Sequence, residues 1–285
     1  MGNYTGPKRR RPLRAVLVAL ALLLAAGWFF FDQQNRIQTE VFTLSSSTLP
    51  AAFDGFRVVQ ISDLHGKEFG PENETLLRKV AEQSPDLIAI TGDLVDDAAQ
   101  FSMIEPLAKG LAAIAPTYYV TGNHEWAIRE AYTVKALLRE CGVTVLSNEF
   151  FPLERGGETI VLAGIDDPNG PYDQKTPETL GEELRAAYGE AYTLVLAHRN
   201  EYHATYSAAG FDLTLAGHAH GGLIRLPFTD GLVDARRQLF PDYTAGWYAL
   251  EGGGEMVVSR GLGNVGYTFR LFNRPHLPVI VLSAG

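Results

Sequence analysis

Cysteine is almost absent from this sequence: Cys141 is the single cysteine in 285 residues. One cysteine cannot form an intramolecular disulfide, and it provides no pair with the spacing of a CxxC-type metal site. Any metal that the chain binds must therefore be held by carboxylates, imidazoles and amides.

Basic residues are scarce beyond the N-terminus. The formal net charge is −9, and it becomes −14 when the five cations of the N-terminal segment are set aside. A protein that binds phosphate backbones normally carries a clustered stripe of Lys and Arg, whereas only short pairs such as Arg236 and Arg237 occur here. We therefore expect no nucleic acid among the partners, and a DNA nuclease conflicts with this acidic surface.

The composition is that of a folded protein. Hydrophobic residues make up 46% of the chain and charged residues 20%, which argues against wholesale disorder. A chain of this length can bury a substantial core in one large α/β domain or in two smaller ones. We favour one domain over residues 51–285, and the oligomeric state stays open.

Only one long hydrophobic run is present. Residues 15–31 form an uncharged apolar stretch of 17 residues, which spans about 25 Å as a helix. We expect residues 1–14 to be a basic cytoplasmic segment, residues 15–31 a transmembrane anchor and residues 32–50 a linker. The basic flank predicts a single-pass protein of the cell membrane, with the N-terminus in the cytoplasm and the catalytic domain outside it.

Two other interpretations of the N-terminus remain open. Ala25, Ala26 and Gly27 offer a poor small-residue site for cleavage of a secretory signal. The aromatic run Trp28–Phe31 instead suits an anchor at the membrane interface, which favours an uncleaved segment. Arg10 and Arg11 also loosely resemble a twin-arginine export signal.

The first half of the remaining chain alternates predicted strands with predicted helices. The alternation favours a largely parallel sheet covered by helices. We expect strands at 57–61, 87–91 and 118–121, and helices at 71–83, 101–115 and 130–141. The second half is richer in strands and glycine, which predicts a second mixed sheet packed on the first. Its expected strands are 159–165, 192–197, 213–216, 223–226, 246–250, 255–259 and 279–282, with a helix at 177–188 and a hairpin turn at Gly252–Gly254.

Acidic, amide and imidazole side chains follow several of these strands. The carboxyl ends of parallel strands meet at one edge of a sheet, where ligands collect, so we expect these side chains to lie together. Their oxygen and nitrogen atoms suit a divalent metal. The stretches that carry them are Ser62–His65, Gly92-Asp93, Gly122–Glu125, His198 and Gly217–His220.

Read in order, these motifs resemble those of the calcineurin-like metallophosphoesterases. The pattern D-x-H, G-D, G-N-H-[DE], H and G-H-x-H is matched through about 160 residues by Asp63/His65, Gly92/Asp93, Gly122–Glu125, His198 and Gly217–His220. The stretches Gly92–Asp96, Gly217–Gly222 and Ser259–Gly263 more narrowly resemble a bacterial, often membrane-attached subfamily of phosphodiesterases. Some members of that subfamily act on phospholipid-like substrates, including nucleotide-linked lipid precursors.

The resemblance implies a four-layer αββα sandwich of two mixed sheets and a site for two divalent ions. One ion would be held by Asp63, His65 and His220, and the other by Asn123, His198 and His218, with Asp93 bridging them. The donor set suits Mn²⁺ first, with Fe or Zn²⁺ as alternatives. A hydroxide shared by the ions would attack phosphorus in line.

The resemblance also assigns roles beside the metals. His124 would stabilise charge on the phosphate and protonate the leaving oxygen, a task that its near-neutral pKa fits. Glu125 either orients a metal-binding imidazole or begins the next helix. The expected function is hydrolysis of phosphodiester or pyrophosphate bonds in an envelope lipid or nucleotide-type substrate. A catalytically silent scaffold that binds protein partners at the membrane is the alternative.

Other polar residues receive more ordinary interpretations. We expect His203 to be a surface or substrate-side group and His276 to be structural. Loop chemistry and solvation explain most of Asp96, Asp97, Asp166 and Asp167, although the last two follow a strand and can line the cleft. The chain departs from the family pattern at His198-Arg199-Asn200, where relatives commonly have H-x-P, and Arg199 is a candidate for substrate contact.

Overall fold

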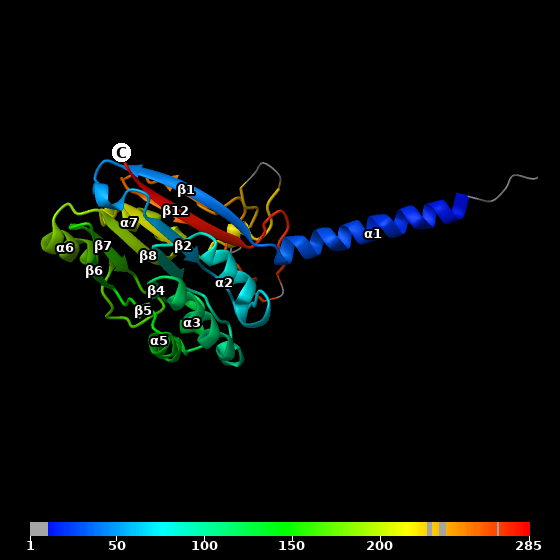
Figure 1. Ribbon diagram of the computed structural model, residues 1–285, viewed down its shortest axis with the longest axis horizontal. Coiled ribbons are helices and arrows are strands. Elements are labelled where there is room, and N and C mark those ends of the chain that lie inside the picture. The colour runs from blue at the N-terminus through cyan, green and yellow to red at the C-terminus, as the bar shows by residue number, and fades with distance from the viewer. Residues whose placement is uncertain (1–10, 227–229, 234–237, 267) are drawn as a thin grey trace, which may run out of the picture.

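The structure is a computed structural model that describes residues 11–226, 230–233, 238–266 and 268–285. Two six-stranded sheets form its centre (Figure 1). The order in the first sheet is β1-β12-β2-β3-β4-β5, and the order in the second is β10-β11-β9-β8-β7-β6. The strands of the first sheet are β1 (Gln38–Ser46), β2 (Arg57–Ile61), β3 (Leu87–Thr91), β4 (Thr117–Val120), β5 (Thr144–Val145) and β12 (His276–Ala284). Those of the second are β6 (Glu149–Arg155), β7 (Glu158–Gly164), β8 (Thr193–Arg199), β9 (Leu213–Gly217), β10 (Gly246–Ala249) and β11 (Glu255–Val258).

Both sheets are mixed, as predicted. Strands β2 to β5 are parallel to one another, and β12 runs antiparallel to β2. In the second sheet β7, β8, β9 and β11 are parallel, and β6 and β10 are antiparallel edge strands. The glycine run Gly252–Gly254 lies in the β10–β11 hairpin, which confirms the predicted turn.

The helices are α1 (Arg11–Asn35), α2 (Glu74–Ala81), α3 (Ile104–Ile114), α4 (Asn123–Ala127), α5 (Ala131–Glu140), α6 (Pro177–Tyr188) and α7 (His203–Ala208). Helices α2, α3 and α5 cover the outer face of the first sheet, and α6 and α7 cover that of the second. Short 3-10 turns lie at Ala51–Phe53, Pro71–Asn73, Ala98–Met103, Asn200–Tyr202 and His220–Gly222. Leu76 of α2 and Leu107 of α3 pack on the first sheet, whereas Leu180 and Leu184 of α6 pack on the second.

Neighbouring residues of one strand enter different hydrophobic layers. Val58 belongs to the core between the sheets, whereas Val59 faces the α2–α3 side. In β8, Leu194 faces the first sheet and Val195 faces α6. This alternation of side chains along a strand builds the predicted four-layer αββα sandwich.

Two sequence-based assignments are wrong. Residues 38–46 of the expected linker form β1, which pairs in parallel with β12 along its whole length. The expected strand at 223–226 is not an element of either sheet: Ile224 and Arg225 make only isolated bridges, to Leu271 and Gly231. The structure also contains β5 and β6, which the sequence analysis did not identify.

Helix α1 extends away from the sandwich (Figure 1). Its span Leu13–Asn35 is long and apolar enough to cross a membrane by length and composition, and its most apolar stretch is not buried by the rest of the chain. The last turn differs, because Asp32 forms an ion pair with Arg274 at 2.6 Å and Gln33 is buried.

Candidate metal centre

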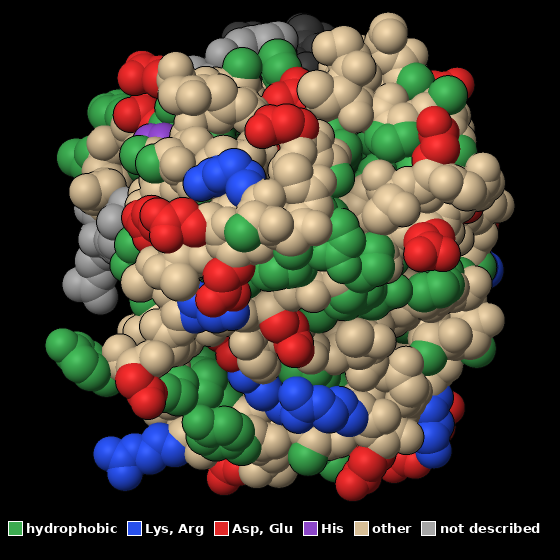
Figure 2. All heavy atoms as spheres, turned by 90° about the vertical axis from the view of Figure 1, so that its left-hand side faces the viewer, with side chains coloured by type: hydrophobic (Ala, Val, Ile, Leu, Met, Phe, Trp, Pro, Cys, Tyr) green, Lys and Arg blue, Asp and Glu red, His purple; other side chains and the backbone are tan. Residues whose placement is uncertain are grey.

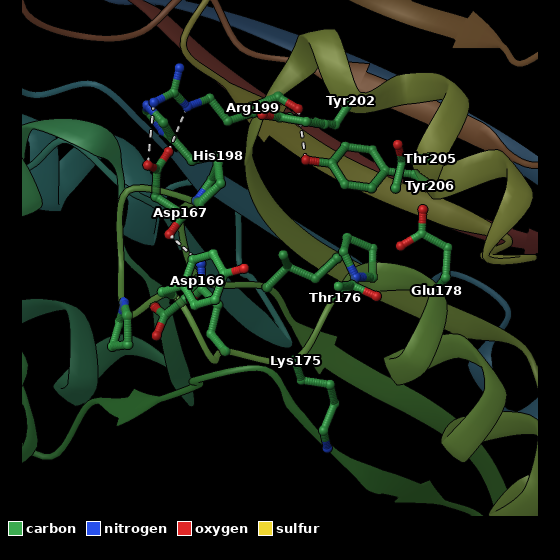
Figure 3. Close-up of a pocket in the computed structure, with 16 residues that line it drawn as sticks. Asp166, Asp167, Lys175, Thr176, Glu178, His198, Arg199, Tyr202, Thr205 and Tyr206 are labelled. Atoms are coloured by element: carbon green, nitrogen blue, oxygen red, sulfur yellow. Dashed lines mark hydrogen bonds and ion pairs between the residues drawn. The ribbon is translucent and has the colours of Figure 1, made fainter.

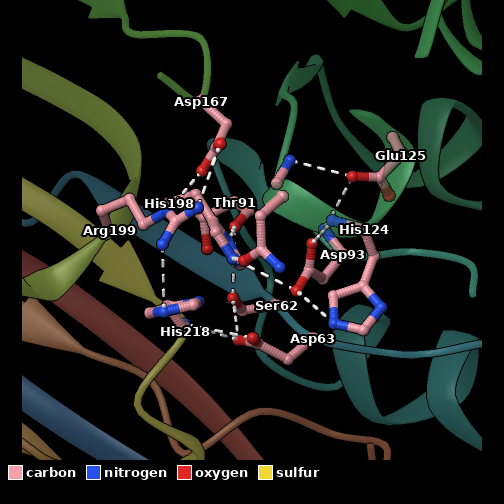
Figure 4. A network of polar contacts seen from close by, with 12 residues as sticks. Ser62, Asp63, Thr91, Asp93, His124, Glu125, Asp167, His198, Arg199 and His218 are labelled. Carbon is pink, nitrogen blue, oxygen red and sulfur yellow. Dashed lines mark hydrogen bonds and ion pairs between the residues drawn. The ribbon is translucent and has the colours of Figure 1, made fainter. Parts of the chain in front are cut away.

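The predicted ligands all lie at the carboxyl ends of strands. Asp63 and His65 follow β2, Asp93 follows β3, and Asn123 begins α4 directly after β4. His198 is the next-to-last residue of β8, and His218 and His220 follow β9. The structure therefore brings the candidate ligands, together with His124, to one edge of the sandwich. Figure 4 shows Asp63, Asp93, His198 and His218 with His124.

The side chains form two groups around Asp93. Ligand atoms of Asp63, His65 and His220 lie within 4.8 Å of one another, and so do those of Asp93, His198 and His218. Asp93 also lies within this distance of His65 and His124, so its carboxylate stands between the groups. Asn123 completes the second group, because its Oδ1 lies 3.1 Å from His198 Nε2.

Hydrogen bonds on the far side of two rings determine which nitrogen faces the site. His198 Nδ1 lies 2.8 Å from the Thr91 carbonyl, and His65 Nδ1 lies 2.5 Å from Asp96 Oδ1. Both partners are acceptors, so in the neutral rings Nδ1 carries the proton and Nε2 presents a lone pair. The His198 lone pair faces Asp93 Oδ2 at 3.2 Å, and the His65 lone pair faces His220 Nε2 at 3.1 Å.

This donor set fits a divalent cation. When the His198 ring is neutral, the buried Asp93 Oδ2 has no hydrogen-bond donor among the described residues. Burial alone would lower the pKa of His198, but the Asp93 carboxylate beside it raises that pKa to about 10. The Asp93 carboxylate therefore stabilises positive charge beside His198, and a cation held by the converging acceptors would supply that charge.

The loops that carry these side chains have an unusual backbone. Asp63, His65, Asp93, His218 and His220 all have φ between 49° and 66°. Residues other than glycine occupy this left-handed region at an energetic cost, and such strain concentrates at functional sites. The surrounding hydrogen bonds hold it in place: for example, His65 N donates to the Asp93 carbonyl at 3.0 Å.

Two glycines allow the loops to approach one another. A Cβ atom on Gly122 would lie 2.1 Å from Asp93 Oδ1, and one on Gly217 would lie 2.5 Å from Asp63 Oδ2. No side chain fits at these distances, so the glycines of the G-N-H and G-H-x-H patterns are required by packing at the site.

Of its two expected roles, Glu125 takes the one at the start of the next helix and does not orient an imidazole. It lies in the first turn of α4 and is fully buried, but its carboxylate binds backbone amides rather than an imidazole. It accepts from Leu94 N at 2.6 Å and from Gly122 N at 2.9 Å. Burial, together with the charge of Asp93, raises the pKa of Glu125 to about 7. Glu125 therefore fastens the Asp93 loop to the start of α4.

Asp96 was missed by the sequence analysis. Its Oδ1 lies 2.5 Å from His65 Nδ1 and 2.7 Å from His124 Nδ1, so one carboxylate orients both rings. Burial opposes its ionisation, but its hydrogen bonds to His124 and His65 lower the pKa of Asp96. The signal available in the sequence was the second aspartate of Gly92-Asp93-Leu94-Val95-Asp96, three residues after the candidate ligand.

Asp167 also has a defined partner. Its carboxylate is buried and binds the Arg199 guanidinium twice, at 2.6 Å to Nε and 3.3 Å to Nη2. The pair holds Arg199 at the rim of the metal centre, with Nη1 3.4 Å from His218 Nε2. Loop solvation is therefore the wrong explanation for Asp167.

A cavity of about 360 Å³ opens beside this rim (Figure 3). His198, Arg199 and Asp167 lie on one side of it, with Tyr206, Thr205 and Glu178 on the other. Among the candidate ligands, His198 lines this cavity. Arg199 is thus placed where a substrate can reach it.

The remaining histidines have structural surroundings. The His203 ring stacks on Tyr243 with centroids 4.1 Å apart, away from the candidate ligands. His276 is fully buried in β12, where Nδ1 accepts from Arg260 N at 3.2 Å. Neither belongs to the groups of possible metal ligands found in the described residues.

An αββα sandwich with this cluster at its strand ends defines a metal-dependent phosphoesterase. Comparison with known proteins identifies the family. The chain belongs to the calcineurin-like phosphoesterases, whose family model matches residues 56–222. It is therefore a metal-dependent phosphoric ester hydrolase.

Relatives of similar length occur in bacteria. The metallophosphoesterase YkuE of Bacillus subtilis is 29% identical over 289 residues, covering 97% of this chain and 98% of YkuE. The phosphodiesterase YaeI of Escherichia coli is 28% identical over 283 residues, covering 96% and 98%. A transmembrane protein with a metallophosphoesterase domain from Danio rerio is 29% identical and covers 93% of this chain but 62% of that protein.

Solved structures support the fold alone. The NAD nucleotidase NadN of Haemophilus influenzae superposes with a TM-score of 0.50 at 17% identity, covering 73% of this chain. The chain spans about half the length of that protein, at 50%, and of a 5'-nucleotidase precursor from Thermus thermophilus, at 48%.

Proposed function

We propose that the chain is a dinuclear phosphodiesterase that hydrolyses phosphodiester or pyrophosphate bonds in an envelope lipid or nucleotide-type substrate. The observation that carries this proposal is the position of the Asp93 carboxylate between two groups of converging acceptors. The name of the relative YaeI, a phosphodiesterase, supports the preference for diesters.

In this proposal Asp63, His65 and His220 hold one ion, and Asn123, His198 and His218 hold the other, with Asp93 shared. The mixed oxygen and nitrogen set favours Mn²⁺, with Fe or Zn²⁺ as alternatives. Two such ions, when bound, activate a water for attack on phosphorus and neutralise charge on the phosphate oxygens. The chain itself holds the metal-binding side chains in position and donates a proton to the leaving group.

His124 is the proposed proton donor to the leaving oxygen. Its backbone amide donates to Asp93 Oδ1 at 2.8 Å, and its Nδ1 lies 2.7 Å from Asp96. These contacts hold Nε2 at the cluster, 3.8 Å from Asp93 Oδ2. Burial favours the neutral ring, but the hydrogen bond to Asp96 and the nearby carboxylates raise the pKa of His124. A protonated imidazole at this position suits a general acid.

The groups of possible ligands offer a second interpretation of His124, because it lies with His65 and Asp93 in one of them. A His124→Ala variant separates the two roles. As a proton donor, His124 can be removed with both ions retained and a loss of about 100-fold or more in kcat. Loss of one ion per chain in this variant, measured by elemental analysis, would make His124 a ligand instead.

Arg199 is the proposed contact to a phosphate oxygen. Asp167 and Glu201 hold its guanidinium, with Glu201 Oε1 3.3 Å from Nη1, at the entrance between the cavity and His218. A guanidinium fixed in this way binds phosphate oxygens at little entropic cost.

The experiment uses the full chain in detergent micelles, stripped of metal with a chelator and then reloaded with Mn²⁺, Zn²⁺ or Mg²⁺. We expect Mn²⁺ to restore hydrolysis of bis-p-nitrophenyl phosphate more than that of p-nitrophenyl phosphate, and Asp93→Ala to abolish both. A fully metallated wild-type chain that hydrolyses neither ester nor a nucleoside diphosphate would contradict the proposal and favour the scaffold alternative.

The proposed location is the cell membrane, with α1 as an uncleaved single-pass anchor, the basic segment 1–14 in the cytoplasm and the catalytic domain outside. The uncharged run in α1 supports the span, and the five cations that precede it support the orientation. Protease treatment of intact cells tests it: we expect the domain to be digested from outside, whereas protection of the domain would reverse the orientation.

A further inference from the structure

The metal centre and the end of α1 lie at the same edge of the first sheet. Helix α1 ends at Asn35, and β1 begins three residues later beside the first residue of β12, in the register Gln38 to His276. Strand β12 runs antiparallel to β2, with Val279 opposite Val59. The start of β1 is therefore at the edge where β2 ends and Asp63 follows.

Direct contacts join the last turn of α1 to the loops of the site. Lys67, two residues after His65, donates from Nζ to the Gln34 carbonyl. The Gln34 side chain donates to the Arg270 carbonyl at 2.7 Å, and its Oε1 accepts from Arg270 N at 3.1 Å. The loop that carries His65 is thus one hydrogen bond away from the helix that is apolar enough to span a membrane.

Exposed aromatic side chains continue from α1 onto the domain. The Phe272 ring lies 5.4 Å from that of Phe29, and the Phe269 ring lies 6.3 Å from that of Phe30. Phe269 is 51% exposed and Phe272 46%. These rings belong to the loop before β12, so apolar surface extends sideways from the anchor over the edge of the domain.

A second segment adds to this surface. Leu239 and Phe240 are 72% and 75% exposed. Backbone contacts connect them to the Phe272 loop: Phe240 N donates to the Leu232 carbonyl, Leu232 N to the Ile224 carbonyl, and Ile224 pairs with Leu271. We name Leu239, Phe240, Phe269 and Phe272 the apolar rim.

We propose that the apolar rim lies in the membrane–water interface beside α1, so that the metal centre faces the bilayer and takes phosphoesters carried by lipids. The bilayer is the occupant because the rim is continuous with α1, whose apolar stretch no described part of the chain covers. Burying large apolar side chains stabilises by about 25 cal/mol per Å² removed from water, and aromatic rings favour the membrane interface.

The opposite end of the molecule contrasts with this edge. Figure 2 views the end that points away from α1, where acidic and basic side chains lie above and below a central band of hydrophobic ones. Such a surface suits water rather than a bilayer. The docked orientation therefore brings the rim, and not the far end, to the membrane.

The location of the rim can be measured without any substrate. The full chain is placed in phosphatidylcholine vesicles with its single cysteine replaced, Cys141→Ser, and one new cysteine is labelled with an environment-sensitive nitrobenzoxadiazole dye. Phe240→Cys and Phe269→Cys report on the rim. Ser47→Cys, exposed just beyond the far end of β1, is the control.

We expect spin-labelled lipids to quench the dye at least twofold at positions 240 and 269 and to leave position 47 unchanged. Iodide in the water phase should quench position 47 alone. Equal quenching by iodide at all three positions would overturn the inference. A dye at 240 that neither lipid nor iodide quenches would also overturn it, because a protein surface would then cover the rim.

The substrate class rests on the proposed function, so its test uses two esters with the same leaving group. Phosphatidyl-p-nitrophenol in vesicles is compared with bis-p-nitrophenyl phosphate in solution, for the wild type and for Leu239→Ser/Phe240→Ser. We expect the variant to lose at least tenfold on the lipid ester and to stay within twofold on the soluble ester. Leu239→Ile/Phe240→Leu keeps apolar side chains and should behave like the wild type.

The possible failures are distinct. A wild type inactive on both esters contradicts the proposed function, and the quenching result still decides whether the rim is docked. A serine variant that retains full activity on the lipid ester contradicts the inference alone.

Discussion

The Nδ1 atoms of His65 and His124 both face one carboxylate, that of Asp96, at 2.5 and 2.7 Å. This arrangement could not be predicted from the sequence, because His65 and Asp96 come from different loops that meet only when β2 and β3 pair. The ligands themselves were predicted because each stands in a local motif. Asp93 follows Gly92 and Asn123 follows Gly122, whereas Asp96 and Asp167 look like ordinary loop residues.

At the residue scale, Asp96→Asn tests this shared orientation. An amide cannot accept from both rings with the strength of a carboxylate, so we expect metal affinity or kcat to fall by about 10- to 100-fold. Titration with Mn²⁺ and steady-state kinetics measure the two effects. The control is Asp97→Asn, because the Asp97 side chain accepts from Ala99 N at 2.8 Å and asparagine preserves that cap. Equal behaviour of the two variants would contradict the role of Asp96.

At the scale of the element, β1 shows where a local pattern misleads. Its residues are rich in Ser and Thr, and most of them are at least partly exposed, as expected for an edge strand with few core side chains. Its partner β12 lies more than two hundred residues away in the sequence, so no nearby turn signals the pairing. Strands followed by candidate ligands, such as β2 and β3, were predicted because they are short, mostly apolar runs with a buried core.

The pairing of β1 with β12 determines how far the chain can be shortened from its N-terminus. Deleting residues 1–46 removes β1 and uncovers the ladder of β12, whereas deleting residues 1–31 keeps β1 and the Asp32–Arg274 ion pair. We expect the shorter fragment to melt at least 5 °C below the longer one, since about 1 kcal/mol shifts the melting temperature by a few degrees. Thermal unfolding in the same detergent measures this. Equal melting temperatures would show that β1 adds no stability.

His276 of β12, which lies beside Glu40 of β1, makes the free energy of unfolding depend on pH. Burial and the Arg260 charge lower the pKa of His276 from 6.5 to about 4, so the folded state favours the neutral ring. Its stabilising contribution is complete above about pH 6.5 and is lost as the pH falls toward 4, because the unfolded chain then binds the proton. The loss amounts to about 3 kcal/mol over that range.

His276→Gln removes this titration, and the measurement is the free energy of unfolding by urea at several pH values. We expect the variant to lose less stability than the wild type between pH 6.5 and 4. The pKa of Glu40, which the hydrogen bond from His276 lowers from 4.5 to about 2, makes Glu40 lose its own stabilising contribution as the pH falls below about 4.5. The decisive part of the comparison is therefore the range from pH 6.5 to 5. Parallel curves for the two proteins would contradict the assignment.

At the scale of the whole molecule, the parallel strands of both sheets end at the same edge. The alternation of strands and helices predicted that Asp63, Asp93 and Asn123 would share an edge, because parallel strands end together. The same rule brings His198 and His218 to that edge from the second sheet. The order of strands was not predictable, since it depends on which buried faces pack between the sheets. The position of α1 beside the site is therefore apparent only from the folded structure.

The most direct test of this account counts the metal ions. The full chain is equilibrated with Mn²⁺, dialysed and analysed by inductively coupled plasma mass spectrometry, alongside Asp93→Ala. We expect two ions per wild-type chain and a loss of both in the variant, because Asp93 stands between the two groups of ligands. A wild-type chain that retains at most one ion, or an Asp93→Ala chain that still retains two, would contradict the dinuclear centre.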